Sequence, residues 1–427
     1  MLRNASLCLL ATSLVLVGSS HAQNANPEDV GLSSKQLALI QQAVQVNIAT
    51  GQIPGAIVLV ARDGKVVYTD AQGAADPAGK QPLKIDSIFP LASLTKPIIA
   101  TAILMLVDEG KMGLNDPIGK YIPELGGARQ VRVLRPGSPP YPYSPLPGPL
   151  PESSEYGPAQ FDLVPALREI TVRDLLTHTS GIQEFGVGND FPNPTPGDAL
   201  ATRLPKLVAA PLEFQPGSRW AYSNGWGFDV LGRMVEVASG MPLNQFIKQR
   251  LLDPLGMKDT DFGVHRDAAA RAVSQFGPRV QFSDEVTYFS GAAGIQSTVP
   301  DYVKFVQMLM DGGRANGKQF LKPETVKAMS SNQINWLRMS GYPPMAMPAE
   351  GLRFGYGVML VSTPAAAGTR LPAGSFGWDG VGSRRWWVIP EQRIAIVMMA
   401  PLIGPMAAPL HRMVEAAVMS SIITSRP

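Results

Sequence analysis

The fold is decided by the stretch Ser93-Leu94-Thr95-Lys96-Pro97-Ile98-Ile99-Ala100-Thr101-Ala102-Ile103-Leu104-Met105-Leu106. Its second half is almost entirely apolar, which indicates a helix buried within a core. Pro97 is tolerated in the first turn of a helix but not in its centre, so the helix is predicted to begin near Ala92 or Ser93. The polar residues of the stretch would then lie in a first turn that faces a cleft.

Ser93 and Lys96 are spaced so that they can act together. Residues i and i+3 share a helix face, with Cβ atoms about 5–6 Å apart. A serine hydroxyl is a poor nucleophile until a base takes its proton, and partial burial favours the neutral lysine that can do so. Free N–H groups at the start of the helix suit an oxyanion hole. Because a chain of this size contains about one S-x-x-K by chance, the spacing alone does not establish a site.

Tyr222 is a second candidate for proton transfer. It begins the triplet Tyr222-Ser223-Asn224, and Gln215-Pro216-Gly217 predicts a tight turn just before it. A helix is predicted from Gly227, so Tyr222 would lie in a short loop. A lysine ammonium beside it would stabilise the phenolate and allow it to act as a general base. The alternative is a tyrosine that only packs at the entry of the helix.

β-strand patterns cluster at both ends of the chain. Asp63-Gly64 separates the apolar runs 56–61 and 65–69, and a second hairpin is predicted from residues 385–389 and 394–399. The sequence therefore predicts an α/β (α+β) protein, with one antiparallel sheet built from both termini, flanked by helices, and an inserted all-helical domain. Helices are predicted at 33–50, 98–109, 172–177, 227–238, 243–251, 300–310 and 406–422.

The predicted domain boundaries follow from these patterns. Residues 23–110 and 270–427 would form the sheet domain, and residues 111–269 the helical insertion. Residues 126–158 are rich in Pro and Gly and are predicted to form a loop within the insertion. We interpret it as a surface insertion; the alternative is a rim over the active site, in which Tyr141 and Tyr143 contact the substrate.

Residues 1–22 are predicted to be a secretory signal peptide. Arg3 supplies positive charge, residues 7–17 are mainly apolar, and Ser20-His21-Ala22 offers a cleavage site. The apolar stretch is shorter than the roughly 20 residues that cross a bilayer. We therefore expect an exported protein, periplasmic or secreted, with no membrane insertion after cleavage; an uncleaved anchor is the alternative. The single cysteine, Cys8, lies inside this segment, so no disulfide is expected in the mature chain.

Composition and the histidines exclude several function classes. The formal net charge is +3 and no run of Lys or Arg occurs, so no nucleic-acid partner is expected. A Ser-His-Asp catalytic triad that would include His178 and Ser180 is disfavoured, because the chain has no G-x-S-x-G elbow. We expect neither a metal nor another cofactor, because the two pairs with metal-like spacing have no second His or Cys nearby; these pairs are His265 with Asp261 and His411 with Glu415.

Taken in order, these motifs resemble the serine β-lactamase and penicillin-recognising superfamily. The pattern is closest to class C β-lactamases and to the carboxylesterases that share their fold. The resemblance implies that Ser93 is the nucleophile, that Lys96 assists it, that Tyr222 is base and proton relay, and that Asn224 orients the substrate or Lys96. It runs from about residue 30 to 400 and depends on the segments 93–96, 174–181, 222–224, 253–257 and 291–298.

One departure from the family pattern bears on the substrate. β-Lactamases and D-alanyl-D-alanine peptidases usually carry Lys-Thr-Gly or a similar triplet, whose cation holds the substrate carboxylate. This chain has Trp378-Asp379-Gly380 at the matching place, which removes that cation and adds an acid that could repel an anion. Trp-x-Gly resembles the carboxylesterases of the superfamily. Arg384 and Arg385 could restore positive charge nearby.

The resemblance also implies where the substrate binds. The backbone N–H groups of Ser93 and Val381 would form the oxyanion hole, with Trp378 and Gly380 next to the substrate. The sequence thus predicts a secreted carboxylesterase that acts through a Ser93 acyl-enzyme on small or medium acyl esters. The alternatives are a β-lactamase, a D-amino-acid peptidase or a short-oligoamide hydrolase. A further alternative, from another class, is a non-catalytic ligand-binding homologue.

Overall fold

A computed structural model describes residues 25–76, 79–127, 129–135, 161–182, 194–195, 197–223, 225–273, 280–339, 349–402 and 408–423. The predicted signal peptide lies outside these residues, as do positions 136–158 of the predicted loop, with Tyr141 and Tyr143, and Asn224. Within the described ranges, no helix is long and apolar enough to cross a membrane.

The centre of the molecule is a seven-stranded antiparallel sheet in the order β2-β1-β13-β12-β11-β10-β9. Two strands come from the N-terminal end, β1 (Gly55–Arg62) and β2 (Lys65–Gly73). The others are β9 (Leu352–Phe354), β10 (Met359–Val361), β11 (Phe376–Gly380), β12 (Arg384–Ile389) and β13 (Ile394–Met399). β13 pairs with β1, so strands from the N-terminal and C-terminal parts of the chain lie side by side within the sheet. The predicted sheet built from both termini is confirmed.

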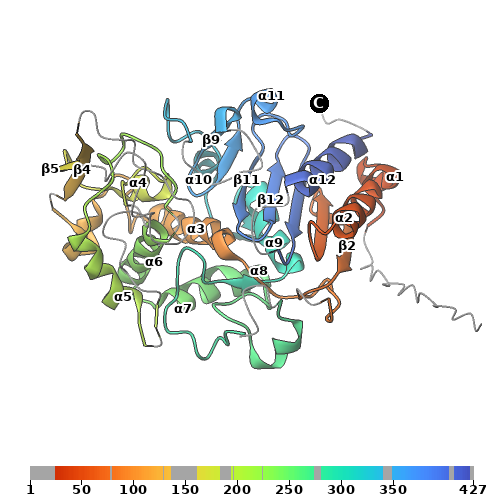
Figure 1. The fold of residues 1–427 in the computed structure, drawn as a ribbon, viewed down its shortest axis with the longest axis horizontal. Helices are drawn as coiled ribbons and strands as arrows, with labels where there is room; N and C mark the ends of the chain where they lie inside the picture. Colours follow the sequence, from red (N-terminus) through yellow and green to blue (C-terminus); the bar gives the residue numbers. More distant parts are fainter. Residues whose placement is uncertain are drawn as a thin grey trace, which may run out of the picture.

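Helices cover both faces of this sheet. α1 (Ser34–Leu37), α2 (Leu39–Ala49) and α12 (Ala408–Ser421) lie together on one face, and α9 (Val299–Met310) packs on the other (Figure 1). The consecutive residues Trp386 and Trp387 of β12 show this arrangement. Trp386 contacts Phe305 of α9, whereas Trp387 donates a hydrogen bond to Glu415 of α12. Both tryptophans are buried because neither face is left to solvent.

The inserted region is largely helical. Its helices are α4 (Val172–Leu176), α5 (Leu200–Arg203), α6 (Trp226–Ser239), α7 (Leu243–Ile247) and α8 (Asp253–Leu255), and α6 packs against α3 (Thr95–Asp108). It also holds a two-stranded sheet, β4 (Gln130–Leu134) with β5 (Phe161–Pro165), which the sequence did not predict. The Pro and Gly content of residues 126–158 masked the short alternation of apolar and polar residues in β4.

The remaining elements are short. Two-residue strands form two further ladders, β3 (Phe89–Pro90) with β6 (Gln296–Ser297) and β7 (Arg314–Ala315) with β8 (Lys318–Gln319). The other helices are α10 (Pro323–Met329), α11 (Pro364–Ala367), the π-type turn η6 (Lys248–Leu252), and the 3-10 turns η1 (Pro27–Val30), η2 (Ala92–Leu94), η3 (Ile118–Lys120), η4 (Pro123–Leu125), η5 (Leu204–Ala209), η7 (Arg266–Arg271) and η8 (Ala349–Gly351).

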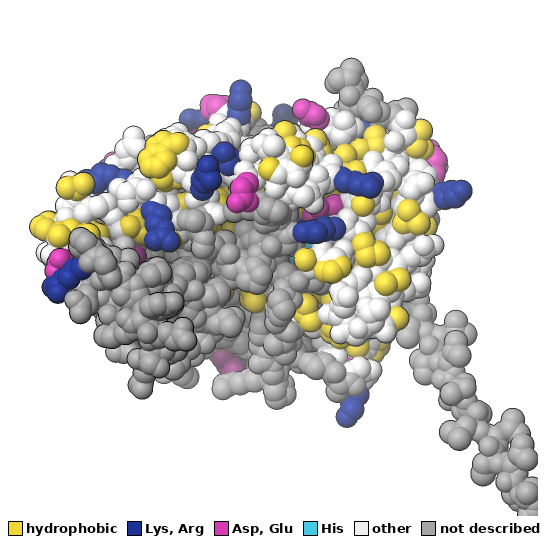
Figure 2. Space-filling view, turned by 45° about the horizontal axis from the view of Figure 1, so that its top comes forward, with side chains coloured by type: hydrophobic (Ala, Val, Ile, Leu, Met, Phe, Trp, Pro, Cys, Tyr) yellow, Lys and Arg dark blue, Asp and Glu magenta, His cyan; other side chains and the backbone are white. Residues whose placement is uncertain are grey.

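Charged side chains are spread over the surface. In the part of Figure 2 formed by described residues, Lys and Arg side chains lie among acidic and apolar ones instead of gathering over one element. This distribution agrees with the small formal net charge of +3. Neither observation gives a basis for proposing a polyanionic partner.

A buried ionic cluster links the sheet to α12. Arg385 of β12 donates to both carboxylate oxygens of Asp379 on β11, at 2.5 and 2.7 Å, and to Glu415 of α12 at 3.2 Å. Thr369 completes the cluster by donating to the second oxygen of Glu415 at 2.9 Å. Burial raises the pKa of Glu415, and the charge of Arg385 opposes that shift. One cation thus serves two enclosed carboxylates.

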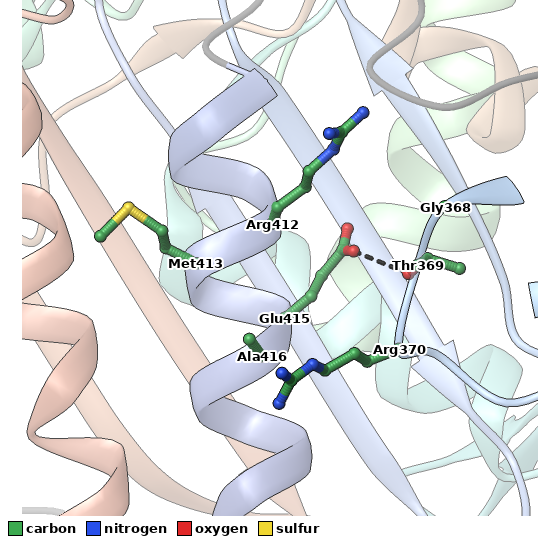
Figure 3. Close-up of a pocket in the computed structure, with 7 residues that line it drawn as sticks. All are labelled: Gly368, Thr369, Arg370, Arg412, Met413, Glu415 and Ala416. Atoms are coloured by element: carbon green, nitrogen blue, oxygen red, sulfur yellow. Dashed lines mark hydrogen bonds between the residues drawn. The ribbon is translucent and has the colours of Figure 1, made fainter. Parts of the chain in front are cut away.

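A cavity of about 310 Å³ opens beside this cluster (Figure 3). Its floor includes Glu415, hydrogen-bonded to Thr369, and the side chains of Arg370 and Arg412 extend on opposite sides of that carboxylate. It lies between α12 and the loop after α11. Along β11, side chains alternate between the two faces of the sheet, so this cavity is on the Asp379 face, opposite the face of Trp378.

Removing Arg385 should strongly destabilise the fold. Arg385→Met would leave two buried carboxylates without their cation, a change that typically costs about 3–5 kcal/mol. Urea unfolding, followed by circular dichroism, measures the loss. Arg266→Met removes exposed pairs with Asp284 and Glu285 and is the control, expected to change the midpoint very little. Equal midpoints for the two variants would contradict this interpretation of the cluster.

Candidate active site

Three predicted residues come together around one hydroxyl group. The Tyr222 hydroxyl donates to Ser93 Oγ at 2.7 Å, and Lys96 Nζ donates to the same oxygen at 3.2 Å. Lys96 Nζ also lies 5.0 Å from the centre of the Tyr222 ring. Ser93 is partly exposed, whereas Lys96 and Tyr222 are buried. A serine with two proton-transferring groups on its oxygen is the arrangement that nucleophilic catalysis requires.

The turn that presents Ser93 is held tightly. Ser93 lies in η2, directly before α3, and the preceding Ala92 has a φ of +48°, a strained value for a residue with a side chain. The neighbouring Leu91 donates its N–H to the Ile295 carbonyl at 2.8 Å. On the other side, the Tyr302 hydroxyl donates to the Leu94 carbonyl at 2.9 Å. These bonds to a distant segment maintain the strained turn.

Lys96 is enclosed by protein. Its side chain is fully buried in the first turn of α3, and Nζ donates to the Ala292 carbonyl at 3.1 Å. The ring of Phe228 lies 5.7 Å from Nζ. A backbone carbonyl, a hydroxyl and two aromatic faces thus take the place of water around this amine.

His178 packs against the Tyr222 ring and holds the backbone next to it. Its Nδ1 accepts the N–H of Ser223 at 3.1 Å, and its ring lies 4.7 Å from the Tyr222 ring. Burial is the main cause that holds the pKa of His178 well below its usual value, and the charge of Lys96 adds to it, so the ring is neutral. Ser180 Oγ instead accepts the N–H of Ile182. The structure therefore does not bring His178 and Ser180 together as a triad.

The residues predicted to bind substrate lie at the end of β11. Trp378 is fully buried, with its ring 5.6 Å from that of Tyr222. Gly380 packs against the Ser93 turn, since a Cβ there would lie 2.7 Å from the Leu91 carbonyl oxygen. Val381 follows and is about half exposed. The roles of Trp378, Gly380 and Val381 in binding, like that of Asn224, remain predictions.

The charges around the triplet differ from the expectation. Asp379 points to the α12 face, where Arg385 neutralises it, so it does not repel a substrate anion near Ser93. Arg385 is equally engaged there. Arg384 is fully buried and donates to the Val381 carbonyl, and burial lowers its pKa to about 9. Strand alternation explains the correction, because Asp379 and Arg385 face away from the side that carries Trp378 and Gly380.

Two further residues of the site escaped the sequence analysis. Ala292 contributes its backbone carbonyl, which no side-chain pattern can reveal. Asp229 accepts the Ala292 N–H at 3.2 Å from within α6. A single acid in the apolar stretch 226–232 was the available signal, since a buried carboxylate needs partners.

Adding a methyl group at Gly380 should displace the turn that carries Ser93. The new Cβ would meet the Leu91 carbonyl oxygen at 2.7 Å and Leu94 Cγ at 3.3 Å. A displacement of 1 Å can cost about 100-fold in rate. We therefore expect Gly380→Ala to slow the labelling of Ser93 by a fluorophosphonate by about that factor, as measured by mass spectrometry of the intact protein.

Gly374→Ala is the matched control, because Gly374 precedes the same strand and no atom of the described residues lies within 4 Å of a Cβ placed there. Its φ of +85° means that alanine adds local strain without moving the turn. Labelling of Gly380→Ala at the wild-type rate would show that the contact with Leu91 does not position Ser93.

Comparison with known proteins identifies the family. The model of the family described as Beta-lactamase matches residues 38–413. Protein Rv1367c of Mycobacterium tuberculosis is 30% identical over 381 residues, covering 84% of this chain and 88% of that protein. Esterase EstB of Burkholderia gladioli is 29% identical over 415 residues, covering 88% and 94%. Among solved structures, EstCE1, a hydrolase with promiscuous acyltransferase activity, has a TM-score of 0.68 at 23% identity and covers 90% of this chain and 98% of its own.

These matches agree with the resemblance that the sequence motifs predicted, and the likeness to EstCE1 confirms the fold. The matched family model spans most of the chain, and an esterase is among the relatives that cover most of it. The chain therefore belongs to the beta-lactamase family and is a serine hydrolase of the penicillin-recognising superfamily.

Proposed function

We propose that this protein is an exported carboxylesterase that hydrolyses small or medium acyl esters through an acyl-enzyme on Ser93. The observation that carries the proposal is the convergence of Tyr222 and Lys96 on Ser93 Oγ, at 2.7 and 3.2 Å. EstB, which aligns with most of the chain, is named an esterase, and this supports the choice of ester as substrate.

The first half-reaction acylates Ser93. Tyr222, as a phenolate stabilised by the nearby ammonium of Lys96, takes the Ser93 proton while Oγ attacks the ester carbonyl carbon. The bond from that carbon to the alcohol oxygen then breaks, and the leaving alcohol takes the proton from Tyr222. The product of this half-reaction is an ester between Ser93 and the acyl group.

The second half-reaction releases the acid. A water molecule gives its proton to Tyr222 and attacks the acyl carbon, the bond to Ser93 Oγ breaks, and Ser93 recovers the proton. Both tetrahedral intermediates carry a negative oxygen, which the N–H groups of Ser93 and Val381 would bind. The packing of Gly380 against Leu91 supports this assignment, because it sets the end of β11 beside the Ser93 turn.

The surroundings of β11 favour a neutral ester over an anionic lactam or peptide. Trp378 stands where relatives that bind a substrate carboxylate usually carry a cation. Of the two nearby arginines, Arg385 is committed to Asp379 and Glu415, and Arg384 is fully buried. Neither presents its charge at the surface next to Ser93, so an anionic substrate would gain little from them.

Replacing Ser93 should abolish hydrolysis. Ser93→Ala removes the atom that forms the acyl-enzyme, and removal of a nucleophile lowers kcat by several powers of ten in comparable enzymes. Steady-state hydrolysis of nitrophenyl butyrate measures the effect. Ser180→Ala is the matched control, because Ser180 is a buried serine whose Oγ accepts the Ile182 N–H, so its loss should leave kcat close to wild type. Near-normal hydrolysis by Ser93→Ala would refute the mechanism.

A substrate panel distinguishes the remaining activities. Wild-type protein would be assayed with nitrophenyl butyrate, nitrocefin and a D-alanyl-D-alanine peptide, each with Ser93→Ala as the blank. We expect the highest kcat/KM for the ester. A dominant lactam or peptide rate would replace the proposed function with a β-lactamase or peptidase. Absence of any Ser93-dependent rate and of fluorophosphonate labelling would indicate a ligand-binding homologue.

Export can be tested separately. The sequence of residues 1–22 predicts cleavage after Ala22, which would leave Gln23 as the first residue. We expect N-terminal sequencing of protein expressed from the full gene in a Gram-negative host, and recovered from the periplasm or medium, to begin at Gln23. Recovery only from the membrane fraction, with Met1 retained, would favour the uncleaved anchor.

A further inference from the structure

We infer that Asp229 is a positioning residue for Lys96 and acts through the backbone of the loop 288–292. This inference rests on the proposed function, because it assigns a role in activating Ser93. Segment 291–298 contributed to the family resemblance, but no role in the reaction was predicted for it. The contacts of Asp229 supply one.

Three donors of this loop converge on the Asp229 carboxylate. Oδ2 accepts the Tyr288 hydroxyl at 2.6 Å, and Oδ1 accepts the Ser290 hydroxyl at 2.8 Å and the Ala292 N–H at 3.2 Å. Burial raises the pKa of Asp229, while the three donors and the charge of Lys96 act in the opposite direction. A carboxylate with donors on both oxygens is arranged to serve as an acceptor.

The loop lies directly on the backbone of α6. A Cβ at Gly291 would lie 2.3 Å from the Phe228 carbonyl oxygen, so only glycine permits this approach. Phe228 is the residue before Asp229, and the loop is therefore fixed both by contact and by hydrogen bonds at the same place on the helix. This leaves the peptide groups of the loop little freedom to rotate.

The other end of the segment is tied to the Ser93 turn. The Ile295 N–H donates to Thr95 Oγ1 at 3.3 Å, and the Ile295 carbonyl accepts the Leu91 N–H at 2.8 Å. Ala292 lies between these bonds and Asp229. Its N–H is donated to the carboxylate, and its carbonyl accepts Lys96 Nζ at 3.1 Å.

This arrangement determines the direction of the Lys96 amine. One N–H of Lys96 is directed to the Ala292 carbonyl, and a second is directed to Ser93 Oγ at 3.2 Å. The Ala292 N–H and the Ala292 carbonyl belong to successive peptide groups, so Asp229 does not polarise that carbonyl through a shared amide. By holding the N–H, it fixes the backbone of Ala292 and with it the direction of the carbonyl that accepts Lys96. Asp229 thus acts on Lys96 through the loop, and it does not need to contact the substrate.

Tyr288→Phe tests the role of the network with a small change. It removes one hydroxyl from the carboxylate and leaves every residue that contacts Ser93 in place. Loss of a hydrogen bond to a charged group is expected to lower kcat for nitrophenyl butyrate about tenfold, with KM within twofold of wild type. The rate of fluorophosphonate labelling should fall by a similar factor. Asp229→Asn, which also removes the charge, should have a larger effect on both.

Tyr121→Phe is the matched control. The Tyr121 hydroxyl donates to Asp116 at 2.5 Å, so the variant also removes a tyrosine–carboxylate bond from a packed tyrosine, but it lies outside the Lys96 network. Thermal midpoints of all variants are measured alongside. We expect Tyr121→Phe to keep the wild-type kcat even where its midpoint falls as much as that of Tyr288→Phe.

The outcomes separate this inference from the proposed function. A wild-type kcat and labelling rate in Tyr288→Phe would overturn the inference, as would an equal loss of kcat in Tyr121→Phe. Neither result affects the Ser93 mechanism, which is tested separately by Ser93→Ala and by the labelling and substrate panel of the wild-type protein. If Asp229→Asn does not fold, Tyr288→Phe decides the question alone.

Discussion

The structure depends on the enclosure of one amine, that of Lys96, within protein. Water is replaced there by the Ser93 hydroxyl, the Ala292 carbonyl and the faces of Tyr222 and Phe228. A buried cationic group without such partners would be strongly unfavourable, so each partner must be held in place. The elements around the site do this. Lys96 itself lies in α3, Phe228 belongs to α6, and Ala292 belongs to the segment after Tyr288, so three parts of the chain meet at this amine.

The large sheet contacts the site through strand β11. Gly380, at the end of β11, touches the turn that carries Ser93, and the neighbouring Trp378 packs against Tyr222. The opposite face of the same strands is occupied by the Asp379–Arg385–Glu415 cluster, which joins the sheet to α12. Alternation along β11 thus separates a stabilising ion cluster on one face from an apolar wall next to Ser93 on the other.

Local patterns predicted most of the fold and part of the site. The buried helix after Ser93 and the terminal hairpins follow from periodicity, and the spacing of Ser93 and Lys96 places them on one face. Tyr222 lies far away in sequence, so only the family resemblance linked it to Ser93. The pairing of Asp379 with Arg385, the acceptor role of the Ala292 carbonyl and the short β4–β5 sheet were not predicted. The pairing of Asp379 with Arg385 depends on the register between β11 and β12, and the role of Ala292 depends on a backbone carbonyl. Composition and periodicity encode neither.

The pairing of β1 with β13 has a consequence for the order in which the molecule is made. Ile57 lies opposite Met399, so the first hairpin finds its neighbour only after some 340 further residues have been synthesised (399 − 57 = 342). The strained turn at Ala92 likewise lacks its hydrogen bonds to Ile295 and Tyr302 until those residues have been synthesised. Contacts between such distant residues make folding slow and leave early segments without partners. An emerging chain therefore carries Ser93 without its contacts to Tyr222 and without the bonds of its turn to residues 295 and 302, and the geometry around Ser93 forms only after those later segments have been made.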